Sequence, residues 1–136
     1  MAYKSKEDQK RVSDAFYQDH KDEIKANNRL WKKRNPVNVF RSRVKRNAKR
    51  AKVDFDLDLE WFEQRLRRGA CEATGLPFVN SDKPMAPFQP SVDRTDPNGG
   101  YTEDNCKMVI WMYNAGKGDN SHKDVMTMAR ALCTQS

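Results

Sequence analysis

Residues 91–119 constrain the fold of this chain more than any other segment. The apolar approach at 91–94 predicts a strand that ends at Asp93-Arg94, and DPNGG at 96–100 is a strong turn signal. The apolar run CKMVIW at 106–111 predicts a return strand, after which the segment from Asn114 to Lys117 is expected to start a helix. A hairpin followed by a helix can bring Asp93 near Asn114, as an acid–amide pair for one cation. The same residue types also serve as ordinary turn and cap residues.

Charge divides the chain into a basic and a slightly acidic part. Residues 1–70 hold 20 Lys and Arg against 11 Asp and Glu, whereas residues 71–136 hold 6 against 8. Residues 29–52 contain 11 basic residues and no acidic one. A cationic segment this dense indicates a polyanionic partner, most often nucleic acid, because solubilising helix faces usually mix both signs. We therefore expect residues 1–52 to be a basic helical arm that binds nucleic acid.

The arm is expected to contain two helices. Residues 5–34 have a weak helical pattern of apolar positions, and Asn35-Pro36 is a suitable start for a second helix. Its apolar stripe would comprise Phe40, Val44, Ala48 and Ala51. The other faces carry the residues expected to contact DNA phosphates: Arg41, Arg43, Lys45, Arg46, Lys49 and Arg50.

The remaining elements follow from local signals. Residues 53–57 alternate apolar and acidic side chains, which predicts a short half-exposed strand. Asp58 is a suitable N-cap for a helix that ends near Gly69, and Gly75 suits a left-handed turn position. Residues 79–90, with three prolines, predict an irregular loop. A last helix would start at Ser121, with Asp124 completing its cap and Val125, Met128, Ala129 and Leu132 buried.

Cysteine content and hydropathy exclude several classes of protein. Three cysteines without a CxxC spacing exclude a structural zinc site of four cysteines and favour buried, reduced thiols in an intracellular setting. No apolar run is long enough for a membrane span, and the N-terminal residues lack the apolar core of a secretory signal. We therefore expect a protein with no membrane association.

The order of residues in 91–119 resembles the ββα-metal core of phage-type HNH (His-Me finger) endonucleases. That pattern runs Asp-His, a glycine-containing loop, an Asn before an apolar strand, and then Asn-x-x-Lys. The matching residues here are Asp93, Gly99-Gly100, Asn105, and Asn114 with Lys117-Gly118-Asp119, the last two being the small or acidic residues that follow the lysine. Including FDLDLEWFEQRL and CEATGLPF upstream, the resemblance covers about residues 53–133. It implies an α+β fold in which residues 53–136 form a small nuclease core with flanking helices.

The resemblance also implies roles for single residues. Asp93 and Asn114 would bind one Mg²⁺ or Mn²⁺ ion, and Asn105 would brace the loop through backbone hydrogen bonds. Lys117 would contact phosphate or hold the helix end. Together with Arg94, which stands at the position of the usual histidine base, Asp93, Asn105 and Asn114 are the expected catalytic residues.

Arg94 is the departure from the pattern, because arginine stays protonated and cannot accept a proton from water. Arg94 could instead hold the scissile phosphate, or the base role could pass to another group such as His122 or Asp96. The third alternative is that the core has lost catalysis and retains only a cationic binding surface.

We therefore expect a metal-dependent endonuclease that hydrolyses double-stranded or branched DNA. If it is phage-encoded, as the resemblance implies, it would act in the cytoplasm of a bacterial host. The alternative is an inactive HNH-like scaffold that binds nucleic acid or acts as an inhibitor. A third possibility, an RNA-binding protein led by residues 29–52, has no RNA-recognition motif to support it.

Overall fold

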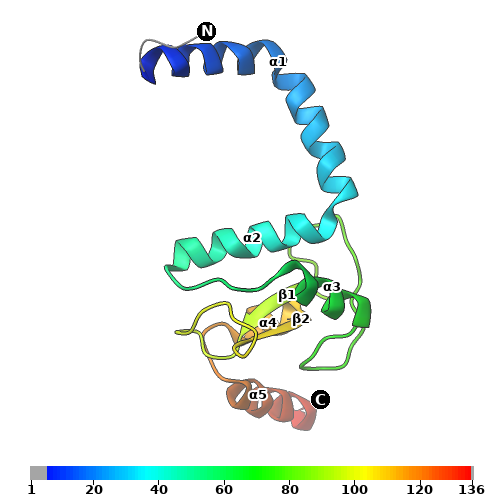
Figure 1. Ribbon diagram of the computed structural model, residues 1–136. Coiled ribbons are helices and arrows are strands. Elements are labelled where there is room, and N and C mark those ends of the chain that lie inside the picture. The colour runs from blue at the N-terminus through cyan, green and yellow to red at the C-terminus, as the bar shows by residue number, and fades with distance from the viewer. Residues whose placement is uncertain (1–5, 136) are drawn as a thin grey trace. The chain divides into compact units, whose positions relative to one another are not determined.

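The computed structural model describes residues 6–135, which form an α+β fold of five helices and one two-stranded antiparallel sheet (Figure 1). In chain order the elements are α1 (Lys6–Arg34), α2 (Pro36–Ala51), α3 (Leu59–Arg68), β1 (Pro90–Arg94), β2 (Cys106–Ile110), α4 (Trp111–Lys117) and α5 (His122–Gln135). The predicted α+β class is confirmed.

The chain divides into two compact units, Met1–Val39 and Phe40–Ser136. In the first unit, α1 is a highly polar helix whose apolar side chains Val12 and Phe16 are 49% and 60% exposed. A helix over 5–34 was expected; residue 5 lies outside the described residues. A compact unit is not in itself a functional one, so the division of roles at residue 52 stays a prediction.

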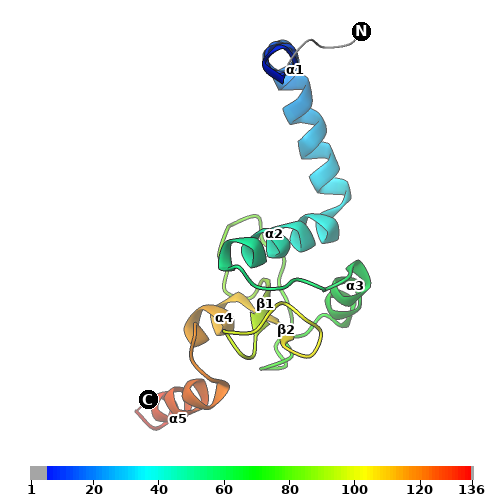
Figure 2. The same ribbon diagram turned by 60° about the vertical axis from the view of Figure 1, so that its left-hand side comes forward.

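Helix α2 begins at Pro36, as the sequence predicts, and packs into the second unit through two small apolar positions. Val44 and Ala48 are 5% and 1% exposed, and Phe40 packs edge-to-face against Phe62 at a ring distance of 5.4 Å. Ala51, expected on the same buried stripe, is exposed because it lies in the last turn. In both views of the second unit, α2 lies on one side of the hairpin and α5 on the other (Figures 1 and 2).

Helix α3 has the boundaries that its cap residues predict. The Asp58 carboxylate accepts a hydrogen bond from the Trp61 backbone N–H at 2.8 Å, and Gly69 ends the helix with φ 74°. The segment before it differs from the prediction. Residues 53–57 form only an isolated bridge between Phe55 and Tyr101, because their sole strand neighbour is the irregular loop that follows β1.

Strands β1 and β2 pair with Asp93 opposite Lys107 and Arg94 opposite Cys106. The core around them contains the fully buried side chains of Leu57, Phe62, Met108, Val109 and Ile110. Strand β2 ends at Ile110, one residue earlier than expected, and α4 starts directly after it at Trp111. Asn114 therefore lies in the middle of α4 and Lys117 at its end, which corrects the expectation that they would start the helix.

Helix α5 has the predicted start but not the predicted burial. The Ser121 hydroxyl accepts from the Asp124 N–H at 3.1 Å, and an Asp124 carboxylate oxygen accepts in return from the Ser121 N–H at 3.4 Å. None of its residues is buried, and Met128 and Leu132 are 51% and 63% exposed. The predicted buried stripe is therefore wrong, because within the second unit α5 contacts chiefly the short α4.

Two of the three cysteines are buried, Cys71 and Cys106, whereas Cys133 is exposed, contrary to expectation. Burial raises the pKa of the Cys106 thiol to about 12. No helix within residues 6–135 combines the length and the apolar character that crossing a bilayer requires.

Candidate active site and nucleic-acid interface

The candidate site is built where one face of β1 meets one face of α4. Ser91 and Asp93 are two residues apart on a strand and therefore point to the same side. Asn114 and Lys117 are three residues apart on a helix and likewise share a face. Asn114 Nδ2 donates to Ser91 Oγ at 2.7 Å and to the Val92 carbonyl at 3.1 Å. The strand and helix periodicities therefore place two polar residues of β1 opposite two of α4: Ser91 meets Asn114, and Asp93 meets Lys117.

Lys117 and Asp93 form the second pair, a buried ion pair. Lys117 Nζ lies 3.2 Å from Asp93 Oδ1 and also donates to the Arg94 carbonyl at 3.1 Å. Lys117 and Asp93 are 1% and 4% exposed. Because water does not solvate either side chain, each charge is stabilised by the opposite charge of the other. This burial does not fit the expected contact between Lys117 and a DNA phosphate. It fits the other expected role, in which Lys117 holds the end of its helix.

Asn105 fixes the loop between the strands through both ends of its amide. Its Nδ2 donates to the carbonyls of Asp96 and Gly100 at 3.1 and 2.9 Å, and its Oδ1 accepts from the Asp96 N–H at 2.9 Å. A Cβ on Gly99 would lie 2.6 Å from Asn105 Nδ2, and a Cβ on Gly100 would lie 3.0 Å from the Asp54 carbonyl oxygen. A side chain at Gly99 would therefore displace the Asn105 amide, and one at Gly100 would press on the Asp54 backbone.

Arg94 points back over this loop. One terminal nitrogen donates to the Gly99 carbonyl at 3.0 Å, and the guanidinium carbon lies 4.9 Å from the centre of the Tyr101 ring. A guanidinium carries five N–H donors, so the bond to Gly99 leaves most of them for another acceptor.

A cleft of about 200 Å³ gathers the predicted site residues, and we call it the hairpin cleft. Its lining comprises Val92, Asp93, Arg94, Pro97, Tyr101, Asn114, Gly118 and Asp119. Asp119, whose carboxylate is exposed, closes the sequence motif but received no role in the site from sequence. Gly118, with φ 53°, turns the chain after α4, and Asp119 lines the cleft.

The other groups considered as bases do not line the hairpin cleft. His122 Nδ1 lies 2.9 Å from the Tyr113 hydroxyl oxygen, and a carboxylate oxygen of Asp96 accepts from the Asn98 N–H at 3.0 Å. Tyr113 is close enough to the site to respond to its charge. Burial, and then the Asp93 carboxylate, raise the pKa of the Tyr113 hydroxyl above its ordinary value.

The donor set of the hairpin cleft is one of hard oxygen ligands. Asp93 uses Oδ1 for Lys117, and Asn114 uses its amide nitrogen for β1, so these bonds leave Asp93 Oδ2 and Asn114 Oδ1 as ligands. Oxygen ligands of this kind suit Mg²⁺ or Mn²⁺, and Asp119 adds an exposed carboxylate to the same cleft. Among the described residues, no group of three or more His, Cys, Asp or Glu side chains could hold a metal ion. Any ion here would rely on the amide oxygen and on water.

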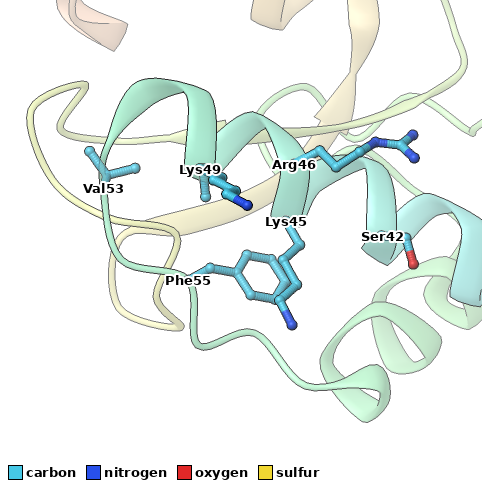
Figure 3. Close-up of a pocket in the computed structure, with 7 residues that line it drawn as sticks. Ser42, Lys45, Arg46, Lys49, Val53 and Phe55 are labelled. Atoms are coloured by element: carbon cyan, nitrogen blue, oxygen red, sulfur yellow. The ribbon is translucent and has the colours of Figure 1, made fainter. Parts of the chain in front are cut away.

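The cations of α2 fall into two classes. The first class has partners within the second unit. Arg41 donates to the Leu57 carbonyl and lies over the Phe55 ring, Arg43 lies over the Phe40 ring, and Arg50 donates to Asn47 Oδ1. Lys45, Arg46 and Lys49 instead line a hollow of about 540 Å³ (Figure 3). We call it the α2 hollow; Ser42, Ala48, Val53 and Phe55 complete its lining.

Comparisons of the chain with protein-family models, with curated proteins and with solved structures found no match. The resemblance to HNH endonucleases therefore depends on the motif residues alone.

Proposed function

We propose that the protein is a metal-dependent DNA endonuclease of the HNH type, with β1, β2 and α4 as a ββα-metal core. One observation carries the proposal: Asp93, Arg94, Asn114 and Asp119 line a single cleft in a strongly basic protein. Two oxygen ligands, a cation and an exposed carboxylate are groups that can assist phosphodiester hydrolysis, as metal ligands, charge stabiliser and proton acceptor.

In this proposal a bound Mg²⁺ or Mn²⁺ ion supplies Lewis-acid stabilisation of the phosphate. Asp93 and Asn114 would hold the ion, and the spare N–H groups of Arg94 would donate to the non-bridging phosphate oxygens. Asp119 is the carboxylate best placed to take a proton from the attacking water, since it lines the cleft and is exposed.

Two further residues would position these groups. Lys117 fixes one oxygen of Asp93 and thereby the direction of the other. Asn105 holds the loop that carries the Gly99 carbonyl, to which Arg94 is bound. Their loss is expected to weaken the site without removing a group that reacts.

Nicking of supercoiled plasmid by the purified protein tests the proposal, with Mg²⁺, Mn²⁺ or a chelator. Asp119→Asn and Arg94→Ala should each reduce the nicking rate by about 10²-fold or more, as expected for loss of an acid–base or charge-stabilising group. Asp104→Asn, an exposed carboxylate on the loop before β2, is the matched control. Metal-independent nicking, or full activity in both variants, would contradict the proposal.

A second candidate is a nucleic-acid-binding scaffold without catalysis. The observation that favours it is the ammonium of Lys117, which already neutralises Asp93 in a buried position and would repel a metal ion. This candidate predicts tight DNA binding with no nicking under any metal. It also predicts that Asp119→Asn leaves DNA affinity unchanged or slightly raises it, because a negative charge near the phosphates is removed.

A further inference from the structure

The α2 hollow combines an apolar floor with a cationic rim. Ala48, Val53 and Phe55 supply the floor, and Lys45, Arg46 and Lys49 supply the rim. No acidic residue lines it, and none of the ion pairs among the described residues involves these three cations. Figure 3 shows the α2 side chains projecting from successive turns, with Val53 and Phe55 on the segment that runs back below the helix.

This combination of surfaces matches an unpaired nucleotide better than a base-paired one. A duplex presents phosphates on its outside and keeps its bases stacked, so it would satisfy the rim and leave the floor empty. An unstacked base brings an apolar ring face that an aromatic side chain can stack upon, with phosphates on either side. The volume of about 540 Å³ is also large enough for a group of that size.

A third hollow shares lining residues with both the α2 hollow and the hairpin cleft. This groove of about 510 Å³, which we call the connecting groove, is lined in part by Val53, Arg94 and Asp119. Val53 also lines the α2 hollow, and Arg94 and Asp119 also line the hairpin cleft. The shared residues therefore place the connecting groove next to both the cationic rim and the candidate catalytic groups.

We propose that the α2 hollow binds an unpaired nucleobase of a DNA strand that runs through the connecting groove to the hairpin cleft. The inference rests on the proposed function and adds a substrate class, DNA with a single-stranded flap or branch. Phe55 stacks on the base, and the three cations hold the adjoining phosphates. The Arg41 guanidinium, 5.2 Å from the centre of the Phe55 ring and bonded to the Leu57 carbonyl, supports that ring.

Binding in chelator tests this inference separately from cleavage. The probes are a labelled duplex with a single-stranded flap and the same duplex fully paired, measured by fluorescence anisotropy. Phe55→Leu keeps an apolar floor but removes the stacking ring, and should weaken flap binding by about 5- to 100-fold with little change for the paired duplex. Phe88→Leu, an exposed phenylalanine outside the hollow, is the matched control.

A second pair of variants avoids the partly buried ring. Ser42 is exposed on α2 and lines the hollow, so Ser42→Leu should fill it and weaken flap binding, whereas Ser42→Ala should not. The emission of a 2-aminopurine base in the flap should change on binding wild type, because the base leaves the stack of its neighbours, and should not change on binding Ser42→Leu.

Three results would overturn the inference. The first is unchanged flap affinity in both Phe55→Leu and Ser42→Leu. The second is an equal loss for flap and paired duplex, which would make the hollow a duplex-backbone contact. The third is self-association of wild type that Ser42→Leu abolishes, which would give the hollow to a second copy of the chain. Absence of nicking with flap selectivity retained would contradict only the proposed function.

Discussion

The hairpin cleft and the α2 hollow use charge in opposite ways. At the cleft the buried ammonium of Lys117 is paired with Asp93, and Arg94 is bonded to the loop it faces. At the hollow, Lys45, Arg46 and Lys49 lie on an exposed helix face without a carboxylate among the lining residues. Charges of the first kind maintain the geometry of a site, and charges of the second kind attract a partner. Mutations in the two regions should therefore be read out by different measurements.

The largest expected effect comes from breaking the buried pair. Lys117→Met leaves Asp93 buried without its counter-charge and should lower the free energy of unfolding by about 3–5 kcal/mol. Urea denaturation measures it, with exposed Lys123→Met as control. Adding Asp93→Asn to Lys117→Met removes the unpaired charge and should recover part of the loss. Equal stability of Lys117→Met and wild type would remove the distinction between the two regions.

Neutralising the rim should affect binding and leave stability nearly unchanged. A triple variant, Lys45→Gln, Arg46→Gln and Lys49→Gln, should reduce the slope of log affinity against log salt by about 2 if each cation neutralises one phosphate of an unpaired strand. At about 0.1 M salt this corresponds to a loss of DNA affinity of roughly 10²-fold or more. The matched control neutralises three exposed lysines elsewhere: Lys83, Lys107 and Lys123. The same loss in the control would show that only total charge matters.

Removing the loop brace should have an intermediate effect. Asn105→Ala deletes three hydrogen bonds to the loop and should lower the free energy of unfolding by about 2 kcal/mol. Asn98→Ala, on the same loop and exposed, should cost much less. If thermal denaturation gives equal midpoints for the two variants, the loop does not depend on Asn105.

The smallest expected effect is a pH dependence of the free energy of unfolding that is confined to alkaline solution. The pKa of the Cys106 thiol rises from 9.0 to about 12 in the folded protein, so folding favours the protonated thiol. Its contribution to stability is full below pH 9 and is lost as the pH rises toward 12. Tyr113, whose pKa is also raised, acts in the same direction. Cys106→Val should flatten the fall in unfolding free energy between pH 9 and 11, whereas Cys133→Val should not.

Local signals predicted the ends of elements better than their burial. The caps Asp58, Gly69 and Ser121 were readable because a cap bonds within a few residues of its own position. The exposure of Leu132 and the burial of Lys117 depend on which distant element covers them, and neither spacing nor charge reveals that. The strand expected at 53–57 failed for the same reason, since it lacks a neighbouring strand to pair with.

The candidate site was predictable as a set of residues but not as an arrangement. Asp93, Arg94 and Asn114 line the cleft that their order in the chain suggested. Asp119 closes the motif, but its role was not predicted, because its place in the cleft depends on the backbone turn at Gly118. The partners of Arg41 could not be predicted from sequence, because Phe55 and the Leu57 carbonyl lie outside α2. Arg43 and Arg50 contact Phe40 and Asn47, each three residues earlier on the helix, a spacing that the sequence does display.

The match between β1 and α4 also has a consequence for folding. A two-stranded sheet is only marginally stable, and a slip of one residue would turn every side chain of β1 to the opposite face. Asp93 would then leave the face that meets Lys117, whose ammonium would be buried without a counter-charge. The slipped hairpin is therefore less stable than the native one, because it loses the Asp93–Lys117 ion pair. The ion pair thus favours one strand alignment over those shifted by one residue.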